Sequence, residues 1–317
     1  KNLQIHPEMK YLFTLVFALL AGVATTMAQT VTITKTDGST VKYKASEIKS
    51  IQFANEESTV KPIHTATGYI LVSSPFFFDT YYGDDAKMEV YAQGGKTYCK
   101  FTDEKWGTGI FEVTLKDNKI TGKGKMSIVD PMKGGAAKEY NAIMAGPMTA
   151  VNISVTGLMG GTTIKWRNGK APETVKLSGT YMGENKIAVG LMGTFTNSNA
   201  GHSFWVNDDG TYSIMVLGQQ INGTAMGDLT LGAYTINNLV YDEKTETFSK
   251  DYSNDGLKMK FKAVKDGATS MDGAYVLTNA NIKATFDKDG NLKVENSFKA
   301  GQMPFPLKAV FNGKIKK

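Results

Sequence analysis

Short segments in which apolar and polar residues alternate run through most of the chain, and they predict β-strands. Residues 31–35 and 41–44 alternate in this way on either side of Asp37-Gly38, a pair that tolerates the positive φ of a tight hairpin turn. Residues 111–116 and 119–121 repeat the pattern around Asp117-Asn118. Between residues 66 and 170 no stretch carries a convincing helical stripe, so we expect an all-β protein.

The chain contains an internal repeat. Its 317 residues favour about two domains. Residues 66–170 and 171–317 share three matching segments in the same order: 67–69 with 179–181, 95–99 with 209–213, and 168–170 with 312–314. The third pair has the largest offset, so we expect the second copy to carry extra strands between Leu257 and Leu292.

Each copy is long enough for a small closed barrel. Eight strands of about seven residues with short turns need roughly 90 to 110 residues. Gly122 and Gly124 lie in the strand after the Asp117-Asn118 turn, where they indicate the bend or bulge that closure requires. A barrel of this size is either filled by side chains or holds one small ligand.

The N-terminal region is typical of a secretory signal. Lys10 precedes an apolar run over residues 11–26 that ends in small residues, so we expect cleavage near Ala28 and a natural start at Met9. The run is shorter than the roughly 20 residues of a membrane span, which disfavours a retained helix. We therefore expect residues 1–28 to be removed, residues 29–65 to form a hairpin and linker, and the product to be secreted across the inner membrane, to the periplasm or outer surface.

Charge and cysteine content limit the possible partners. The formal net charge is +6, and the lysines are spread along alternating strand positions, which is typical of a solvated face and not of a nucleic-acid site. Attraction to an acidic glycan or lipid surface stays open. Cys99 is the single cysteine, so no internal disulfide can form, and alternation places it on the same face as Phe101, inside the core.

Three features together resemble one family. They are Gly-Thr-Tyr at 179–181, Asp-Gly-Thr-Tyr at 209–212, and an apolar leader followed by a hairpin and the segment 47–53. The combination resembles the calycin-like domains of secreted and envelope proteins from anaerobic Gram-negative bacteria. The resemblance implies two tandem lipocalin-like antiparallel barrels, and by analogy of fold a small apolar ligand. The first copy departs from the pattern, with Lys96 where the second copy has Gly210.

The sequence shows no catalytic or metal-binding pattern. Only His64 and His202 follow the leader, and we expect both to be ordinary surface residues, one in the linker and one in a loop. Two Asp-rich segments, 251–256 and 287–291, lack the calcium-loop pattern and are interpreted as hairpin turns. We expect a protein that is not an enzyme and that uses no metal or cofactor.

Methionines and aromatic residues provide the candidate contact residues. Three consecutive aromatics, residues 76–78, cannot all face one barrel interior, so at least one should lie at a rim or surface. Methionines adapt to irregular apolar shapes, including those of ligands. The candidate ligand-binding residues are Phe76, Phe77, Phe78, Tyr81, Met215, Met226, Met303 and Phe305.

Two functional hypotheses follow from these patterns. The first, which we favour at this stage, is a non-enzymatic extracytoplasmic protein that binds a small apolar, lipid-like molecule in one or both barrels. The alternative is a structural or adhesive envelope protein with solid barrels that contacts a glycan or protein partner. Interiors plugged by Trp106, Trp166 and Trp205 would favour the alternative.

Overall fold

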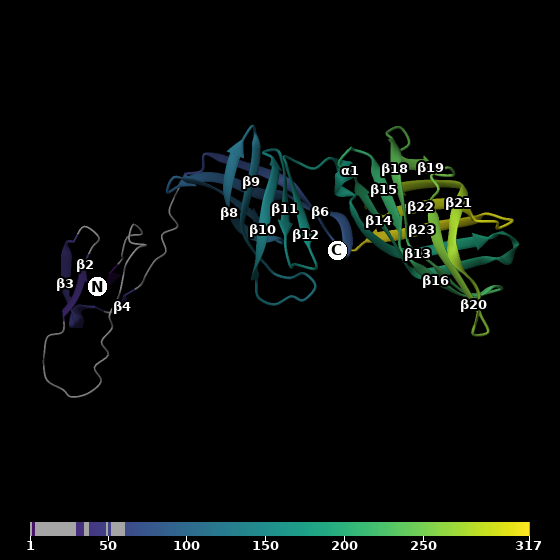
Figure 1. Cartoon of the computed structure of the whole chain (residues 1–317), viewed down its shortest axis with the longest axis horizontal. Helices are drawn as coiled ribbons and strands as arrows, with labels where there is room; N and C mark the ends of the chain where they lie inside the picture. The colour runs from purple at the N-terminus through teal and green to yellow at the C-terminus, as the bar shows by residue number, and fades with distance from the viewer. Residues whose placement is uncertain (1, 4–29, 35–37, 49, 52–60, 317) are drawn as a thin grey trace, which may run out of the picture. The chain divides into compact units, whose positions relative to one another are not determined.

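The structure is a computed structural model that describes residues 2–3, 30–34, 38–48, 50–51 and 61–316 (Figure 1). The chain divides into two units, residues 1–61 and 62–317. The first unit holds the expected hairpin of β2 (Thr30–Thr34) and β3 (Thr40–Lys44), the 3-10 helix η2 (Ala45–Glu47), and two parallel strands, β1 (Asn2–Leu3) and β4 (Ser50–Ile51). Apart from β1, the expected signal segment and its cleavage site lie outside the described residues.

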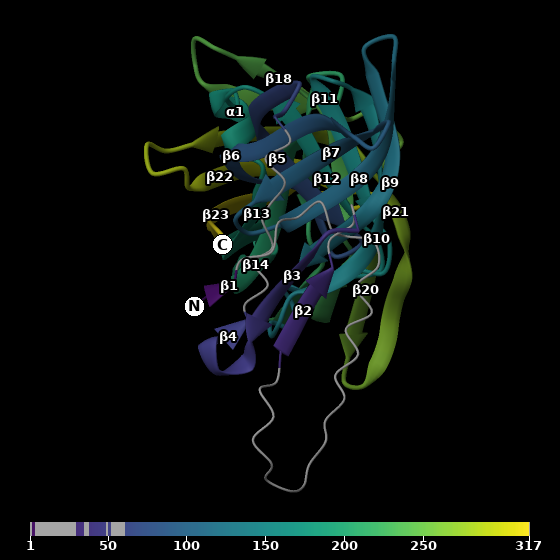
Figure 2. The ribbon, with the colours of Figure 1, turned by 90° about the vertical axis from the view of Figure 1, so that its left-hand side faces the viewer.

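A closed antiparallel barrel of eight strands opens the second unit (Figure 2). The chain winds through it as a meander, and the last strand pairs with the first. The strands are β5 (His64–Ser74), β6 (Phe77–Gln93), β7 (Lys96–Asp103), β8 (Gly107–Lys116), β9 (Lys119–Ile128), β10 (Lys138–Pro147), β11 (Ala150–Val155) and β12 (Thr162–Asn168).

Local turn chemistry and glycines explain how this barrel closes. Asp117 and Asn118 have φ values of 50° and 57° and form the expected tight turn between β8 and β9. At Gly124 a Cβ atom would lie 2.0 Å from the carbonyl oxygen of Ile110, so only glycine allows the two backbones to approach this closely.

The second barrel also has a closed ring of eight antiparallel strands, because β21 pairs with β22. The ring contains β13 (Gly179–Val189), β14 (Thr194–Val206), β15 (Tyr212–Val216), β18 (Tyr234–Asp242), β19 (Thr247–Asp251), β21 (Ala268–Phe286), β22 (Leu292–Ala300) and β23 (Leu307–Ile315). Three further strands extend from the first half of β21: β20 (Lys258–Lys265), β17 (Gly227–Leu231) and β16 (Gln219–Thr224). Two short helices complete it, α1 (Glu173–Lys176) and η3 (Gly190–Met192).

The repeat segments occupy equivalent places in the two rings. Tyr69 and Tyr181 lie in the first strand of each barrel, and residues 95–99 and 209–213 span the turn between the second and third strands. The prediction of extra strands between Leu257 and Leu292 was right for β20 but wrong for β16 and β17. Those two strands form an earlier hairpin, inserted between ring neighbours β15 and β18.

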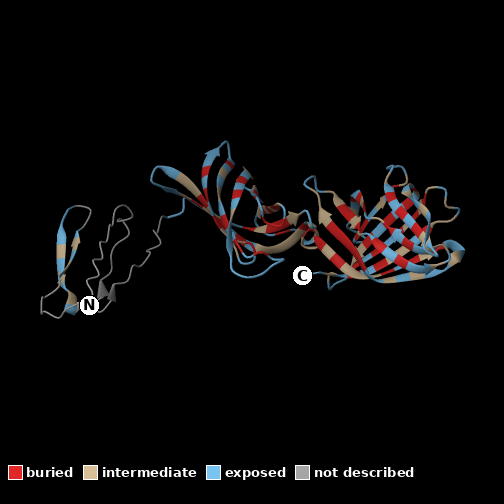
Figure 3. Cartoon of the chain, turned by 60° about the horizontal axis from the view of Figure 1, so that its bottom comes forward, coloured by how far each residue is buried: buried red, intermediate tan, exposed pale blue. Residues whose placement is uncertain are grey.

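Alternation along the strands fills both barrels with side chains (Figure 3). Large buried residues of the first barrel include Ile70, Met88, Phe101, Trp106, Phe111 and Trp166. Those of the second include Tyr181, Phe204, Phe248, Tyr252, Phe261 and Phe311. Cys99 is fully buried in the first core, as expected. The all-β fold predicted from the sequence is therefore confirmed.

Candidate functional site

Two of the three tryptophans lie in the core of the first barrel. Trp106 and Trp166 are 1% and 0% exposed. The Trp166 indole Nε1 donates a hydrogen bond to the Ala86 carbonyl oxygen at 3.0 Å, which fixes the ring across the interior. Trp205 does not fill an interior, because its ring stacks on Phe78 of the first barrel.

The second barrel retains two small interior cavities. The first, which we call the polar chamber, has about 10 Å³ open to the centre of a water molecule. Its polar lining residues are Asn185, His202, Gln219, Tyr234 and Asn296. The second, the apolar chamber, also has about 10 Å³ and is lined in part by Met192, Phe195, Met226, Phe261, Met303 and Leu307. Each has space for about one water molecule, far less than a lipid chain needs.

The candidate residues of the second barrel are only partly brought together. Met226 and Met303 line the apolar chamber. Phe305 lies beside the same end of the barrel, because a Cβ atom at Gly190 would approach its ring to 2.5 Å. Met215 is half-buried on β15 and lines neither chamber.

The aromatic candidates of the first barrel do not form one patch. Phe76 is 65% exposed at the turn between β5 and β6, whereas the Phe77 ring lies 6.5 Å from that of Trp106. Phe78 stacks on Trp205 of the second barrel, with ring centroids 4.3 Å apart and planes 6° apart. Tyr81 packs into a small cluster with Leu71 and Val175. Burial, followed by a hydrogen bond to Asp84, raises the pKa of Tyr81 to about 12.

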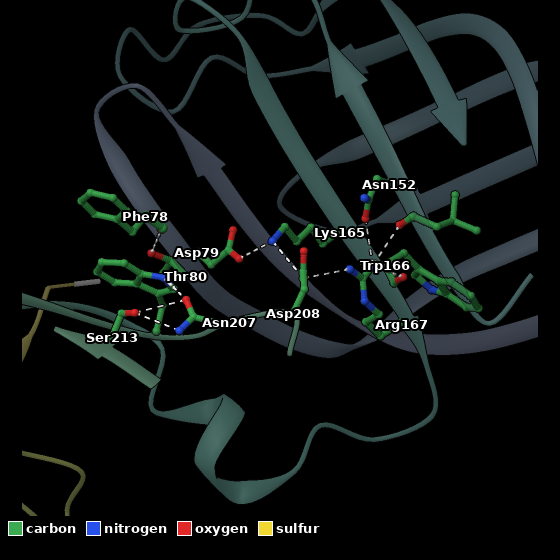
Figure 4. A network of polar contacts seen from close by, with 12 residues as sticks. Phe78, Asp79, Thr80, Asn152, Lys165, Trp166, Arg167, Asn207, Asp208 and Ser213 are labelled. Atoms are coloured by element: carbon green, nitrogen blue, oxygen red, sulfur yellow. Dashed lines mark hydrogen bonds and ion pairs between the residues drawn. The ribbon is translucent and has the colours of Figure 1, made fainter. Parts of the chain in front are cut away.

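A polar network joins the two barrels beside this aromatic stack, and Figure 4 shows its members. The Lys165 ammonium group on β12 lies 2.7 Å from Asp79 on β6 and 3.3 Å from Asp208 in the turn between β14 and β15. Arg167 adds a longer contact of 3.7 Å to Asp208. Asp79 is 8% exposed, so its ion pair with Lys165 is well shielded from solvent, while Asp208 is 76% exposed.

Short side chains hold the Trp205 ring in place for this contact. Its indole Nε1 donates to Asn207 Oδ1 at 3.0 Å, and the Asn207 amide donates to the hydroxyls of Thr211 and Ser213. The Asp-Gly-Thr-Tyr segment therefore positions the junction. This role was not predictable from the sequence, since the partner Phe78 is distant along the chain.

An open groove of about 610 Å³ lies on the second barrel, next to the turn between β21 and β22. Its size falls in the range of small-molecule sites. Its polar lining comprises Thr285, Asp287, Asn291, Lys293, Asn312 and Lys314, and its apolar lining includes Met182, Phe286 and Leu292. None of these residues was among the candidates from the sequence.

The turn beside the groove is internally braced. Asp287 accepts hydrogen bonds from the backbone N–H groups of Asp289 and Asn291 and from the Asn291 amide. These bonds, those from Asn291 foremost, hold the pKa of Asp287 below its usual value. The prediction of a hairpin turn at 287–291 is confirmed. At 251–256 it was wrong, because β19 and β20 flank that segment without pairing to each other.

His202 differs from its expectation as a surface loop residue. It lies within β14, is 3% exposed, and stacks on Phe311 with ring centroids 4.0 Å apart. Burial lowers the pKa of its imidazole to about 3, so the ring is neutral at physiological pH. His64 is exposed at the start of β5.

The described residues hold neither a cluster of metal ligands nor a membrane-spanning helix. Among them, no group of three or more His, Cys, Asp or Glu side chains is arranged to hold a metal ion. Likewise, none of the described helices has the length and apolar character needed to cross a membrane.

Comparison with protein families concerns the second barrel. Residues 177–314 match the model of the calycin-like beta-barrel domain. The second barrel belongs to this family. The match covers the whole ring from β13 to β23 together with the inserted strands, so the calycin-like domain includes both chambers and the groove. The first barrel shares the closed eight-stranded antiparallel architecture of the calycin-like domain.

Other comparisons were distant. A crystal structure of a proposed outer membrane protein from Bacteroides fragilis aligns with 79% of this chain and 96% of its own, at 18% identity and a TM-score of 0.45. A search of curated proteins gave no match.

Proposed function

We propose that this protein is a non-enzymatic envelope protein that acts through the outer surface of solid barrels, and that the groove of the second barrel contacts a glycan. The observation that carries the proposal is the packing of the barrel interiors. Trp106 and Trp166 fill the first, and the chambers of the second each have about 10 Å³. This packing favours the surface hypothesis over an enclosed lipid-like ligand.

The extracytoplasmic location in this proposal rests on the leader sequence. Lys10 followed by the apolar run over residues 11–26 is typical of a segment that directs secretion. A protein delivered to the envelope meets hydroxyl-rich polysaccharide, which a mixed polar and apolar groove can bind.

The groove has the chemistry for such a ligand. Asn312 and Lys314 on β23 are exposed and have no side-chain partner among the described residues, so both can donate hydrogen bonds to sugar hydroxyls. Asn312 can also accept one. Phe286 and Leu292 supply an apolar floor for the C–H faces of a sugar ring.

Native mass spectrometry tests whether the barrels are solid. It is applied to the mature protein purified from its own envelope, and again after incubation with a mixture of palmitate and phosphatidylethanolamine. We expect a clean mass of the polypeptide in both samples. A near-stoichiometric apolar ligand would overturn the solid-barrel proposal. If Met226→Trp then abolished its binding, the ligand would be placed in the apolar chamber.

The groove is tested separately on an array of bacterial polysaccharides. We expect retention of at least one glycan, with about tenfold weaker binding for Asn312→Ala and for Lys314→Ala, because each removes about one hydrogen bond. Lys308→Ala is the matched control, since Lys308 is exposed on the same strand but outside the groove. Equal glycan binding by all three variants would show that the groove is not the binding site. If the array retains no glycan, the proposal of a glycan ligand is overturned.

A further inference from the structure

The polar chamber of the second barrel is unusual for a core, because five polar side chains meet in it. Asn185, His202, Gln219, Tyr234 and Asn296 all line it, and each is 9% exposed or less. They come from β13, β14, β16, β18 and β22, so side chains from five different strands converge on the chamber.

Side-chain hydrogen bonds among these residues and Tyr252 form two separate chains. In the first, the Tyr252 hydroxyl donates to Asn296 Oδ1 at 2.7 Å, and Asn296 Nδ2 donates to the Tyr234 hydroxyl at 2.9 Å. Tyr234 thus accepts a bond and keeps its own O–H to donate. In the second, Asn185 Nδ2 donates to Gln219 Oε1 at 3.1 Å.

Two polar atoms in the same chamber remain without a partner. They are Asn185 Oδ1 and His202 Nδ1, and neither has a hydrogen bond to any described residue. Buried polar atoms of this kind are nearly always satisfied, by protein groups or by ordered water. Both residues line the chamber, next to the Tyr234 hydroxyl that can still donate.

The chamber has the size for one occupant. About 10 Å³ is open to the centre of a water molecule, and a cavity needs roughly 10 to 15 Å³ of such space to hold one water. A buried water also needs two to four polar partners, which these side chains supply. The lining residues include no carboxylate, so the chamber lacks the charged oxygen ligands that a metal cation prefers.

We propose that the polar chamber is a binding site for a single structural water molecule. The water donates to Asn185 Oδ1, accepts from the Tyr234 hydroxyl, and makes its third hydrogen bond with His202 Nδ1. Its donors and acceptors then match those that the protein offers.

This water joins the two hydrogen-bond chains into one, running from Tyr252 through Asn296 and Tyr234 to Asn185 and Gln219. Gln219 is the first residue of β16, where the inserted hairpin leaves the ring after β15. The bound water therefore stabilises the point at which the inserted hairpin leaves the barrel wall. This role does not depend on whether the groove binds a glycan.

A crystal structure of the mature protein at about 1.5 Å resolution tests the site. We expect one spherical density peak within hydrogen-bonding distance of Asn185 Oδ1, His202 Nδ1 and the Tyr234 hydroxyl. Density for a larger molecule would overturn the assignment. So would a side-chain arrangement in which Asn185 and His202 bond directly to protein groups with no peak between them.

Two variants sharpen the test. Asn185→Leu removes the acceptor, and we expect the peak to be lost, whereas Ile187→Leu lines the same chamber with an apolar side chain and should keep it. If Asn185→Leu fails to fold, the wild-type protein still decides the question by NMR. A nuclear Overhauser effect between the His202 ring protons and a long-lived water supports the site, and its absence overturns it.

Discussion

The Phe78 ring of the first barrel lies flat on the Trp205 ring of the second, at a centroid distance of 4.3 Å and an interplanar angle of 6°. At least one of residues 76–78 was expected at a rim or surface, and Phe78 makes an aromatic contact between the two barrels. The Trp205 indole donates a hydrogen bond to Asn207, which holds its ring in the orientation of the stack.

This stack should contribute measurably to stability. We expect a double-mutant cycle of Phe78→Ala and Trp205→Ala, followed by urea unfolding, to give a coupling of about 1 kcal/mol. Phe76→Ala combined with Trp205→Ala is the control and should give a coupling near zero, because Phe76 is 65% exposed. Equal coupling in the two cycles would contradict a specific role for the stack.

The two carboxylates that contact Lys165, those of Asp79 and Asp208, should contribute unequally to the stability of the protein. Lys165→Met leaves the shielded Asp79 carboxylate unpaired, so we expect a loss of about 2–3 kcal/mol, below the value for fully buried pairs. Asp208→Asn should cost less than about 1 kcal/mol, because Asp208 is 76% exposed and its contact is screened. Chemical denaturation of the two variants measures both losses, and a similar cost for each would contradict this ranking.

Features that depend on neighbouring residues were predictable from the sequence. The Asp117-Asn118 turn follows from residues that tolerate positive φ, and the burial of Cys99 follows from the alternation along its strand. The internal repeat also predicted which parts of the two barrels correspond, and the matching segments lie at equivalent places in the two rings.

Features that depend on distant partners were not predictable. His202 was expected in a loop because it follows Gly201, and the sequence does not show which distant residues pack against it. It lies within a strand and is buried in a part of the core that other polar side chains also line. The segment after Asp251 has the turn chemistry of a hairpin, but strand pairing is decided by ring closure between β19 and β21.

The Cys99 thiol should be unreactive in the folded protein. Burial raises its pKa to about 12, so the reactive thiolate is scarce at neutral pH, and the side chain is fully buried. We expect no labelling by DTNB over hours at pH 8 and complete labelling in 8 M urea. Fast labelling of the native protein would show that the first barrel opens or that the thiol is accessible.

The buried His202 should make stability fall as the pH is lowered. Its pKa drops from 6.5 to about 3 on folding, so below pH 6.5 the unfolded chain binds a proton that the folded chain does not. The stability present above pH 6.5 is therefore lost by about 1.4 kcal/mol per pH unit until about pH 3. Among the other residues that line the chamber, Tyr234 is the only titratable one, and burial raises its pKa, so it stays protonated throughout.

The measurement is the free energy of unfolding in urea between pH 7 and pH 4 for the wild type and His202→Phe, which keeps an aromatic ring against Phe311. Carboxylates titrate in both proteins, so only the difference between the two slopes reports on His202. We expect the variant to lose stability less steeply than the wild type. His64→Gln is the control, since it removes the exposed histidine at the start of β5. Parallel curves for the wild type and His202→Phe would mean that His202 is protonated in the folded barrel and is not held neutral by its burial.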